Sequence, residues 1–367
     1  MKRQRFRAGA LSVAAVAALT LSACSSSASS STAGSSAGST ASAGSSSSAG
    51  ATAAQAASIP YSGPEESYKT IGKPTIKAGT KCTIGYQDII ESVPAQKAEQ
   101  DAAGAEAARL GCKYIALNDQ VSPTTQVNNF NQLVAQKVSA IIVFPVVSSS
   151  LTPSLAKAKA AGIYVLGQSA PVAADDPAIP GYSTNMLHMS DTEAYLRVKS
   201  VAEAKPGASF VEMGLAAPVQ LLQYYAARTK YWAAKFGLHY LGEIDASADD
   251  PAGYAAATSA IIAKYPTMQA LFTFSDNSAV GAAAVVRSSG KSGLLISGAD
   301  GSEEAFNAIK AGTVFNTPQP NFLESGVMLV DAAYDLITKQ NLPLPADLGV
   351  PVKLITKANV DSSTPIG

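Results

Sequence analysis

The sequence predicts an α/β protein with two doubly wound parallel-sheet lobes. Short runs rich in β-branched and aromatic residues alternate with longer alanine-rich stretches that suit helices. The alternation restarts after Asn185, so the pattern occurs in two successive sets. Strand segments such as Ala140–Phe144 are apolar throughout, which is typical of parallel sheets covered by helices on both faces.

The first set predicts four strands and three helices. Pro94 suits the first position of a helix, where no N–H is needed, and Gly111 and Gly162 suit helix ends. We expect strands at 82–87, 113–117, 140–144 and 163–166, and helices at 95–110, 124–136 and 151–161.

The second set predicts five strands and six helices. A tyrosine and Pro266 end the helix before the third strand of this set. We expect strands at 209–213, 239–244, 270–274, 294–297 and about 350–355, and helices at 189–204, 221–236, 254–264, 277–289, 303–310 and 324–338.

The N-terminus reads as a secretory signal followed by an anchor. A basic start and an apolar run of about 16 residues, too short for a membrane span, precede small residues and Cys24. Leu21–Cys24 resembles the bacterial lipobox, which implies cleavage before Cys24 and lipidation of its sulfur; an ordinary signal peptide with a chance cysteine is the alternative. We therefore expect a signal peptide at 1–23 and a protein anchored by lipid on the extracytoplasmic face of the cell membrane.

A flexible tether is expected at 24–58. Of the 34 residues from Ser25 to Ser58, 33 are Ser, Ala, Gly or Thr, so no large apolar group offsets the entropy of ordering them. An extended lead-in at 59–80 would connect this tether to the globular part.

Charge and composition argue against a nucleic-acid-binding protein and against a metalloprotein. The chain has 27 basic and 27 acidic residues, and four of the basic ones lie in the first seven positions. The remainder, with 23 basic and 27 acidic residues, carries about −4, which argues against nucleic-acid binding. Two histidines and three scattered cysteines form no metal-ligand motif, so we expect no metal site and no cofactor.

Polar residues follow the predicted strands, where an α/β sheet places its ligands. Gln87, Asp88 and Glu91 follow the first strand, and Gln168 and Ser169 follow the fourth. In the second set, Asp249 and Asp250, Ser275–Asn277, and Asp300 occupy the corresponding places. Many such residues serve as helix N-caps instead, and Asp276 and Asn277 are the strongest candidates for that role.

Four stretches together resemble the type 1 periplasmic-binding-protein family, in particular the ribose-binding-like sugar receptors of ABC importers. Their order and spacing carry the resemblance, which covers most of Lys81–Asn359. The stretches are Ala107–Gly111, Val138–Pro145, Tyr265–Ala282 and Ile296–Gly301.

The resemblance implies two lobes joined by a three-segment hinge. We expect the chain to cross between the lobes near Thr184, at Pro318–Gln319 and at Leu342–Leu344. The first lobe would then comprise 81–183 plus 319–343, and the second 184–318 plus 344–367.

The resemblance also implies ligand-binding residues. Arg228, four residues before Trp232, and Asp300 match an arginine and an aspartate of the family. Ser275 and Asp276 stand where the family has an Asn-Asp pair, and Gln319 matches a hinge glutamine. Arg228 could instead be a surface charge, and Asp300 a turn residue before Gly301.

The first lobe departs from the family pattern. Ala95 and Gln96 replace two aromatic residues, and Ser169 and Ala170 replace an Asp-Arg pair. We expect Gln87, Asp88, Gln168 and Ser169 to bind the ligand instead, with Tyr224 and Tyr225 as groove-wall, core or stacking residues.

The family fold further implies a disulfide between Cys82 and Cys112. Each residue opens one of the first two strands, which are parallel neighbours in that fold, and an exported protein meets an oxidising compartment. Two buried free thiols are the alternative.

These features imply a monomeric solute-binding lipoprotein, not an enzyme. It would capture a small polar ligand, a sugar or polyol, between its lobes and deliver it to an ABC permease. The alternative is a sensory receptor of the same fold that presents a signal molecule to a membrane partner. An exported enzyme is disfavoured because neither histidine lies in a serine or cysteine motif.

Overall fold

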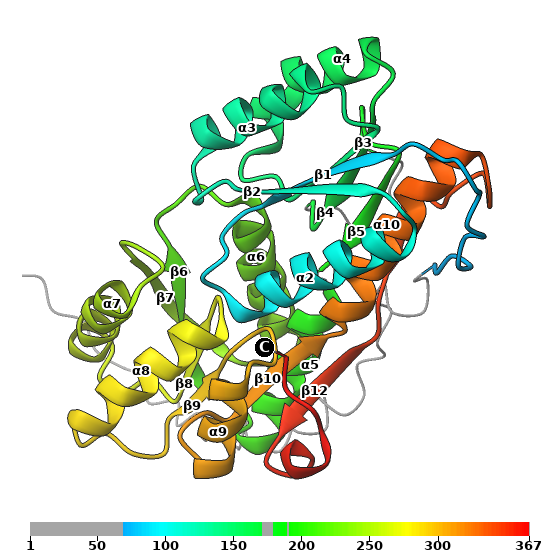
Figure 1. Cartoon of the computed structure of the whole chain (residues 1–367). Helices are drawn as coiled ribbons and strands as arrows, with labels where there is room; N and C mark the ends of the chain where they lie inside the picture. The colour runs from blue at the N-terminus through cyan, green and yellow to red at the C-terminus, as the bar shows by residue number, and fades with distance from the viewer. Residues whose placement is uncertain (1–68, 171–178, 189–190, 367) are drawn as a thin grey trace, which may run out of the picture. The chain divides into compact units, whose positions relative to one another are not determined.

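The computed structural model describes residues 69–170, 179–188 and 191–366, and these form two six-stranded sheets (Figure 1). Cys24, the predicted signal peptide and tether, and residues 59–68 of the predicted lead-in lie outside the described residues. Within the described part, no helix has the length and apolar character needed to cross a membrane.

The first sheet is entirely parallel. On one face lie α2 (Pro94–Arg109) and α10 (Phe322–Thr338), and on the other lie α3 (Pro123–Ala135) and α4 (Thr152–Ala160), which follows a 3₁₀ turn, η2 (Ser148–Leu151) (Figure 1). The strands, in spatial order, are β11 (Asp347–Gly349), β5 (Thr184–Leu187), β4 (Tyr164–Gln168), β3 (Ala140–Val143), β1 (Thr83–Asp88) and β2 (Lys113–Asn118).

The second sheet repeats this plan with one antiparallel strand at its edge. Its strands, in spatial order, are β12 (Val352–Thr356), β10 (Asn316–Pro320), β9 (Leu295–Ser297), β8 (Ala270–Thr273), β6 (Ser209–Leu215) and β7 (His239–Ala246). The pair β10–β12 is antiparallel and the others are parallel.

Five helices cover the second sheet. Apolar side chains of two of them pack on one face and those of the other three on the opposite face. The first pair is α5 (Asp191–Ala204) and α6 (Gln220–Lys235); the others are α7 (Pro251–Lys264), α8 (Asp276–Ser288) and α9 (Glu303–Ala311), and a short turn, η3 (Val360–Ser362), follows β12.

Several helices begin at a side chain that satisfies a free backbone N–H. Asp250 accepts a hydrogen bond from the backbone of Gly253 at 2.7 Å and so begins α7. Ser275 begins α8 through a reciprocal pair of bonds with Ser278. These caps fix where the chain leaves each strand, and therefore where the residues after the strands lie.

The helices α2 and α10 pack closely although they are far apart in the chain (Figure 1). Gly326 permits this approach, because a Cβ atom there would lie 2.2 Å from the carbonyl oxygen of Glu99 and 3.1 Å from the amide of Ala103. The segment that returns from the second lobe is thereby fixed against the first helix of the chain's first lobe.

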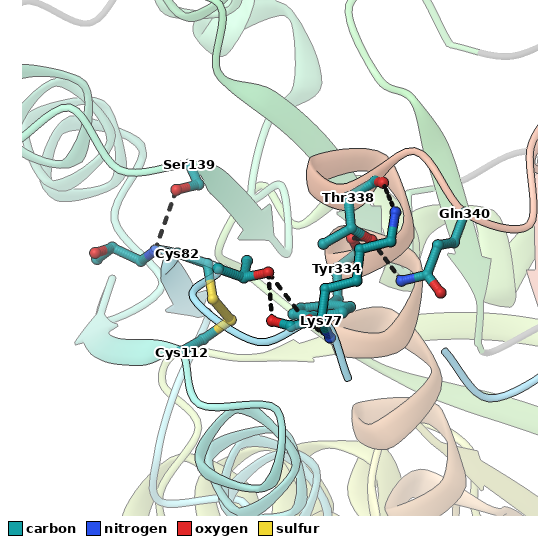
Figure 2. The surroundings of a disulfide bond; sticks show 9 residues. Lys77, Cys82, Cys112, Ser139, Tyr334, Thr338 and Gln340 are labelled. Carbon is teal, nitrogen blue, oxygen red and sulfur yellow. Dashed lines mark hydrogen bonds between the residues drawn. A yellow bond between two sulfur atoms is a disulfide. The ribbon is translucent and has the colours of Figure 1, made fainter. Parts of the chain in front are cut away.

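Cys82 and Cys112 form a disulfide at the start of β1 and β2 (Figure 2). Their Cα atoms lie 4.8 Å apart, because Thr83 and Lys113 are partners in the parallel register. Beside the bond, the backbone amide of Thr83 donates to Ser139 Oγ at 3.1 Å, and that of Lys77 donates to the Tyr334 hydroxyl at 2.9 Å (Figure 2).

The chain changes sheets a few residues later than the sequence analysis expects at each crossing. Thr184–Leu187 belongs to the first sheet, where Thr184 pairs with Leu166. The strand β10 remains in the second sheet to Pro320, and β11 pairs with β5 in the first. The short strands β5, β10 and β11 were not expected, because each mixes polar or proline residues into three to five positions.

Candidate functional site

A cavity lies where the carboxyl ends of the two sheets face each other. It has about 540 Å³ of empty volume, part of it open to solvent. Both lobes contribute residues that come directly after strands, as expected for this architecture. The described lining residues are Ile89, Ile90, Val93, Gln96, Val121, Phe144, Ser169, His188, Leu215, Val219, Leu221, Leu222, Asp249, Phe274, Ser275, Asp300 and Phe322.

The lobes also touch beside this cavity. The backbone amide of Ser148 donates to Gln220 Oε1 at 2.8 Å, and the amide of Gln220 donates to the carbonyl of Val146 at 3.1 Å. Ile89 and Phe144 of the first lobe pack in the same apolar cluster as Leu221 of the second. Ligand-binding groups of both lobes can therefore contact one small molecule.

Two residues on opposite walls of the cavity have left-handed backbone conformations. Ser169 has a φ of 55° and Asp300 a φ of 107°, in a region that non-glycine residues rarely adopt. Such conformations cluster at functional sites, where surrounding structure compensates for their cost. Both residues were predicted from the sequence as ligand-binding residues, and both line the cavity.

The second-lobe wall is acidic. Burial raises the pKa of Asp300 well above its usual range, and the nearby carboxylates of Asp276, Glu193 and Asp249 raise it further. Ligand hydroxyl groups that donate to Asp300 would favour its ionised form, because hydrogen bonds to a charged group stabilise the charge. Asp300 is thus suited to hold a donor, and unsuited to an anionic ligand.

The first-lobe wall contains a buried serine–histidine pair. Ser169 Oγ lies 2.5 Å from His188 Nδ1, and His188 Nε2 lies 3.7 Å from Glu99 Oε1. Glu99 in turn accepts hydrogen bonds from the Ser325 hydroxyl and, at 2.7 Å, from Gln168 Nε2. These contacts therefore join β4, β5, α2 and α10 behind this wall.

This array brings together a hydroxyl, an imidazole and a carboxyl that the sequence analysis did not place together. Its electrostatics disfavour nucleophilic catalysis. Burial lowers the pKa of His188 to about 3 and raises the pKa of Glu99 to about 8. A base this weak, backed by a protonated acid, cannot readily take the serine proton.

Three predicted first-lobe residues lie behind the wall and do not line the cavity. Gln87 is fully buried and donates to Asp119 Oδ1 and to the carbonyl of Gln126, both at 3.0 Å. Asp88 is fully buried, accepts from the amide of Ile90 at 3.3 Å, and burial raises its pKa to about 7. Gln168 bonds to other buried side chains, so all three position neighbouring elements and do not face the ligand space.

Two further predicted site residues also have structural partners. Asp276 Oδ2 accepts from the backbone amides of Gly301 and Ser302, each at 2.7 Å, and so holds the turn that carries Asp300. Gln319 Nε2 donates to the carbonyls of Gly301 at 3.2 Å and Thr364 at 2.9 Å. Neither residue is among those that line the cavity.

Arg228 is held away from the cavity, against the expectation from the resemblance. Its Nε donates to Asp191 Oδ1 at 2.5 Å and its Nη2 to Oδ2 at 2.9 Å. Trp232 Nε1 donates to the same Oδ1 at 2.6 Å, and the Tyr231 ring lies 4.1 Å from the guanidinium. Asp191, absent from the sequence analysis, explains the difference because it engages the guanidinium bidentately.

Three polar residues of the wall were not among the predicted ligand-binding residues. They are Gln96, His188 and Asp249. Asp249 follows the predicted strand ending at Ile244 and was identified there as a polar residue, but it was not assigned to the ligand. Gln96 and His188 were not detectable as wall residues, because His188 follows the unexpected strand β5 and Gln96 lies within the first turn of α2. Ser275, which was predicted, does line the cavity.

A buried arginine explains one of the predicted tyrosines. Arg197 is 2% exposed, donates to the carbonyl of Thr273 at 2.8 Å and lies 3.9 Å from the ring centre of Tyr225. Tyr225 is therefore a core residue of the second lobe and not a stacking platform for the ligand. No group of three or more potential metal ligands occurs within the described ranges.

The sequence matches the periplasmic binding protein domain family over residues 94–341. It is 25% identical over 263 residues to the ribose import binding protein of Bacillus subtilis, covering 69% of this chain and 80% of that protein. It is 26% identical over 276 residues to a xylitol-binding protein of Mycolicibacterium smegmatis, covering 70% and 72%.

Solved structures share the fold. A solute-binding protein from Mycobacterium smegmatis with bound glycerol superposes with a TM-score of 0.70 and 20% identity, covering 78% of this chain and all of that one. A solute-binding protein from Bacillus halodurans with bound myo-inositol gives a TM-score of 0.68 and 21% identity, covering 78% and 98%. The two-lobed α/β fold expected from the sequence is confirmed.

Proposed function

The chain belongs to the periplasmic binding protein family, and from this premise we propose that it captures a small polyhydroxylated ligand between its lobes and delivers it to an ABC permease. The observation that carries the proposal is the cavity between the two sets of strand ends, with Ser169 and Asp300 on opposite walls. The relatives named for ribose and xylitol support a sugar or polyol as the ligand class.

Ligand binding involves no covalent bond formation or cleavage. Asp300 accepts hydrogen bonds from ligand hydroxyls on one side, while Ser169 and Gln96 contact the ligand from the other. Because these groups belong to different lobes, a ligand that engages both favours the closed arrangement and shifts a pre-existing equilibrium. The permease would then recognise the closed form.

We further propose that the protein is monomeric and acts on the extracytoplasmic face of the membrane, anchored through lipid on Cys24. The lipobox-like sequence and the Ser/Ala/Gly/Thr-rich segment behind it support this localisation. A tether of this composition would let the two lobes reach a permease in the same membrane.

A thermal-unfolding screen tests the ligand class. Ribose, xylitol, arabinose, allose and myo-inositol are added in turn to the purified protein. A ligand at 100 times its Kd stabilises a one-site protein by about 2.7 kcal/mol, which produces a clear rise in Tm. Amino acids and sugar phosphates serve as controls. A rise with an amino acid or a phosphate, and with no sugar or polyol, would contradict the proposal.

A further inference from the structure

The wall of the interlobe cavity is mainly hydrocarbon. Of its 17 described lining residues, 11 are apolar, and they include the aliphatic side chains of Ile89, Val219 and Leu222 as well as aromatic rings. The polar residues lie in two groups, one on each lobe. No lysine or arginine is among these described lining residues.

Most polar side chains of the second-lobe wall are already engaged within the protein. Ser275 Oγ accepts from the amide of Ser278 at 3.2 Å in the helix cap. Asp249 accepts from the Tyr254 hydroxyl through Oδ1, and its other lone pairs remain available. The backbone of Asp276 favours the ionised form of Asp300, and a carboxylate can accept about four hydrogen bonds, so Asp300 retains capacity for a ligand.

The first-lobe wall is similarly committed. Ser169 and His188 bond to each other, and His188 Nε2 faces Glu99. Gln96 Oε1 accepts from Gln168 Nε2 at 3.2 Å. The groups left for a ligand are the amide nitrogen of Gln96, the remaining lone pair of Ser169 Oγ, and His188 Nε2, which is buried without a hydrogen-bond partner.

We infer that this cavity selects an amphipathic ligand, a compact hydrocarbon body that carries two or three hydroxyl groups, over a fully hydroxylated sugar. The inference rests on the proposed function, because it takes the interlobe cavity as the ligand site. The protein groups with spare hydrogen-bonding capacity lie in two clusters, one on each lobe, with the apolar wall between them. A ligand with a few hydroxyls can place them at these clusters. Each further hydroxyl would face hydrocarbon and lose its bonds to water.

The expected selectivity is large. One buried hydroxyl without a partner lowers affinity by about tenfold or more. A methylene group placed against the same wall raises affinity by about fourfold. Ligands that share a carbon skeleton and differ in hydroxyl number therefore separate clearly in affinity.

Calorimetric titration with a matched pair of cyclohexane derivatives tests the inference. The probes are trans-1,2-cyclohexanediol, with two hydroxyls, and myo-inositol, with one on every ring carbon. We expect the diol to bind at least tenfold more tightly and with a more negative heat-capacity change, the mark of apolar burial. A cavity variant, Leu222→Asn, adds a donor and an acceptor to the wall and should reduce or reverse this preference. Leu323→Asn, at a side chain 52% exposed outside the wall, is the control and should leave it unchanged.

The outcomes separate the two proposals. Equal or tighter binding of myo-inositol overturns the inference and leaves the proposed function in place, since a polyol is bound. Binding of ribose or xylitol with no binding of the diol would also overturn the inference and leave the proposed function in place. If the diol and every sugar and polyol of the thermal screen fail to bind, both the inference and the proposed function are wrong.

Discussion

Ser169 Oγ lies 2.5 Å from His188 Nδ1, on the first-lobe wall of the cavity and directly in front of Glu99. Ser169 follows β4 and His188 follows β5, so the pair joins the ends of two neighbouring strands. His188 is also the last described residue before the chain passes to α5 and the second lobe. The ligand wall and this connection between the lobes therefore share one buried polar cluster.

The Glu99 carboxyl predicts a specific pH dependence of stability. Burial raises its pKa from 4.5 to about 8, so between these values the folded protein keeps a proton that the unfolded chain releases. Stability is full below the lower value and falls as the pH rises toward the upper one, with a slope approaching about −1.4 kcal/mol per pH unit. Glu99→Gln, which mimics the protonated acid, should lose this part of the slope.

Urea unfolding from pH 4.5 to 8.5 measures this difference. The variant should become more stable than the wild-type protein as the pH rises. Glu324→Gln, at an exposed carboxyl of α10, is the control and should follow the wild-type curve. Parallel curves for the wild-type protein and Glu99→Gln would show that Glu99 is ionised in the folded state.

Asp300 and Arg228 should differ sharply in their effect on ligand affinity. Replacing the carboxylate that faces the cavity, as in Asp300→Asn, should weaken binding at least tenfold, because one hydrogen bond to a charged group contributes about 1.5 kcal/mol or more. Arg228→Ala should change affinity by less than about twofold and lower the free energy of unfolding by about 1 kcal/mol. Titration calorimetry of both variants, at the alkaline end of the stable range, provides the comparison.

Asp300 and Arg228 should also differ in their effect on the pH dependence of ligand affinity. Burial and the nearby Asp276 raise the pKa of Asp300, and hydroxyl donors favour its ionised form, so affinity should rise with pH. Asp300→Asn should remove this rise, and Arg228→Ala should retain it. Equal losses of affinity in the two variants would show that Arg228 contributes to ligand binding.

Most of the fold could be predicted from the sequence, because long helices and apolar central strands carry strong periodic signals. Pro94, Gly111 and Gly162 mark helix ends by backbone chemistry alone. The strands β5, β10 and β11 were missed since each is short and lies near the hinge, where pairing depends on segments distant in sequence. For the same reason, the chain changes sheets a few residues later than predicted at each crossing.

The site was less predictable. Ser169, Ser275 and Asp300 follow strands, and the sequence therefore placed them at the cavity. The orientation of Arg228 depends on Asp191, 37 positions earlier, and no local pattern reports such a pairing. Gln87 and Asp88 end β1, but they bond to Asp119 and to the backbone instead of lining the cavity.

Cys24→Ala should release the protein from membranes. The sulfur is the expected attachment point of the lipid, and no helix of the described part could replace it as a membrane span. Fractionation of cells into membrane and soluble material measures the change. Ser25→Ala is the matched control and should stay with the membranes; a Cys24→Ala protein that also stays there would place the anchor elsewhere.

The Cys82–Cys112 disulfide should stabilise the first lobe. It closes a loop with a sequence separation of 30, and its removal in the Cys82→Ser, Cys112→Ser double variant should cost about 2–4 kcal/mol. Thiol titration of the denatured Cys24→Ala protein is the direct assay: two thiols should appear only after reduction. Two thiols detected before reduction would contradict the bond.

Gly326→Ala should destabilise the protein far more than the loss of a glycine usually would. A Cβ atom at Gly326 would lie 2.2 Å from the Glu99 carbonyl oxygen, and backbone atoms of a packed helix cannot move aside cheaply. The helices α2 and α10 would have to separate, at a cost of about 1–3 kcal/mol or more. Gly104→Ala, in the middle of α2, is the matched control: its Cβ would lie 3.2 Å from the Tyr114 ring, which can yield slightly, and alanine favours the helix by about 1 kcal/mol.

Chemical unfolding should therefore show a loss of stability for Gly326→Ala and little loss or a gain for Gly104→Ala. Because Ser325 and Glu99 bond across the same contact, Gly326→Ala should also weaken ligand binding, whereas an equal stability of the two variants would mean that the helices do not pack this closely.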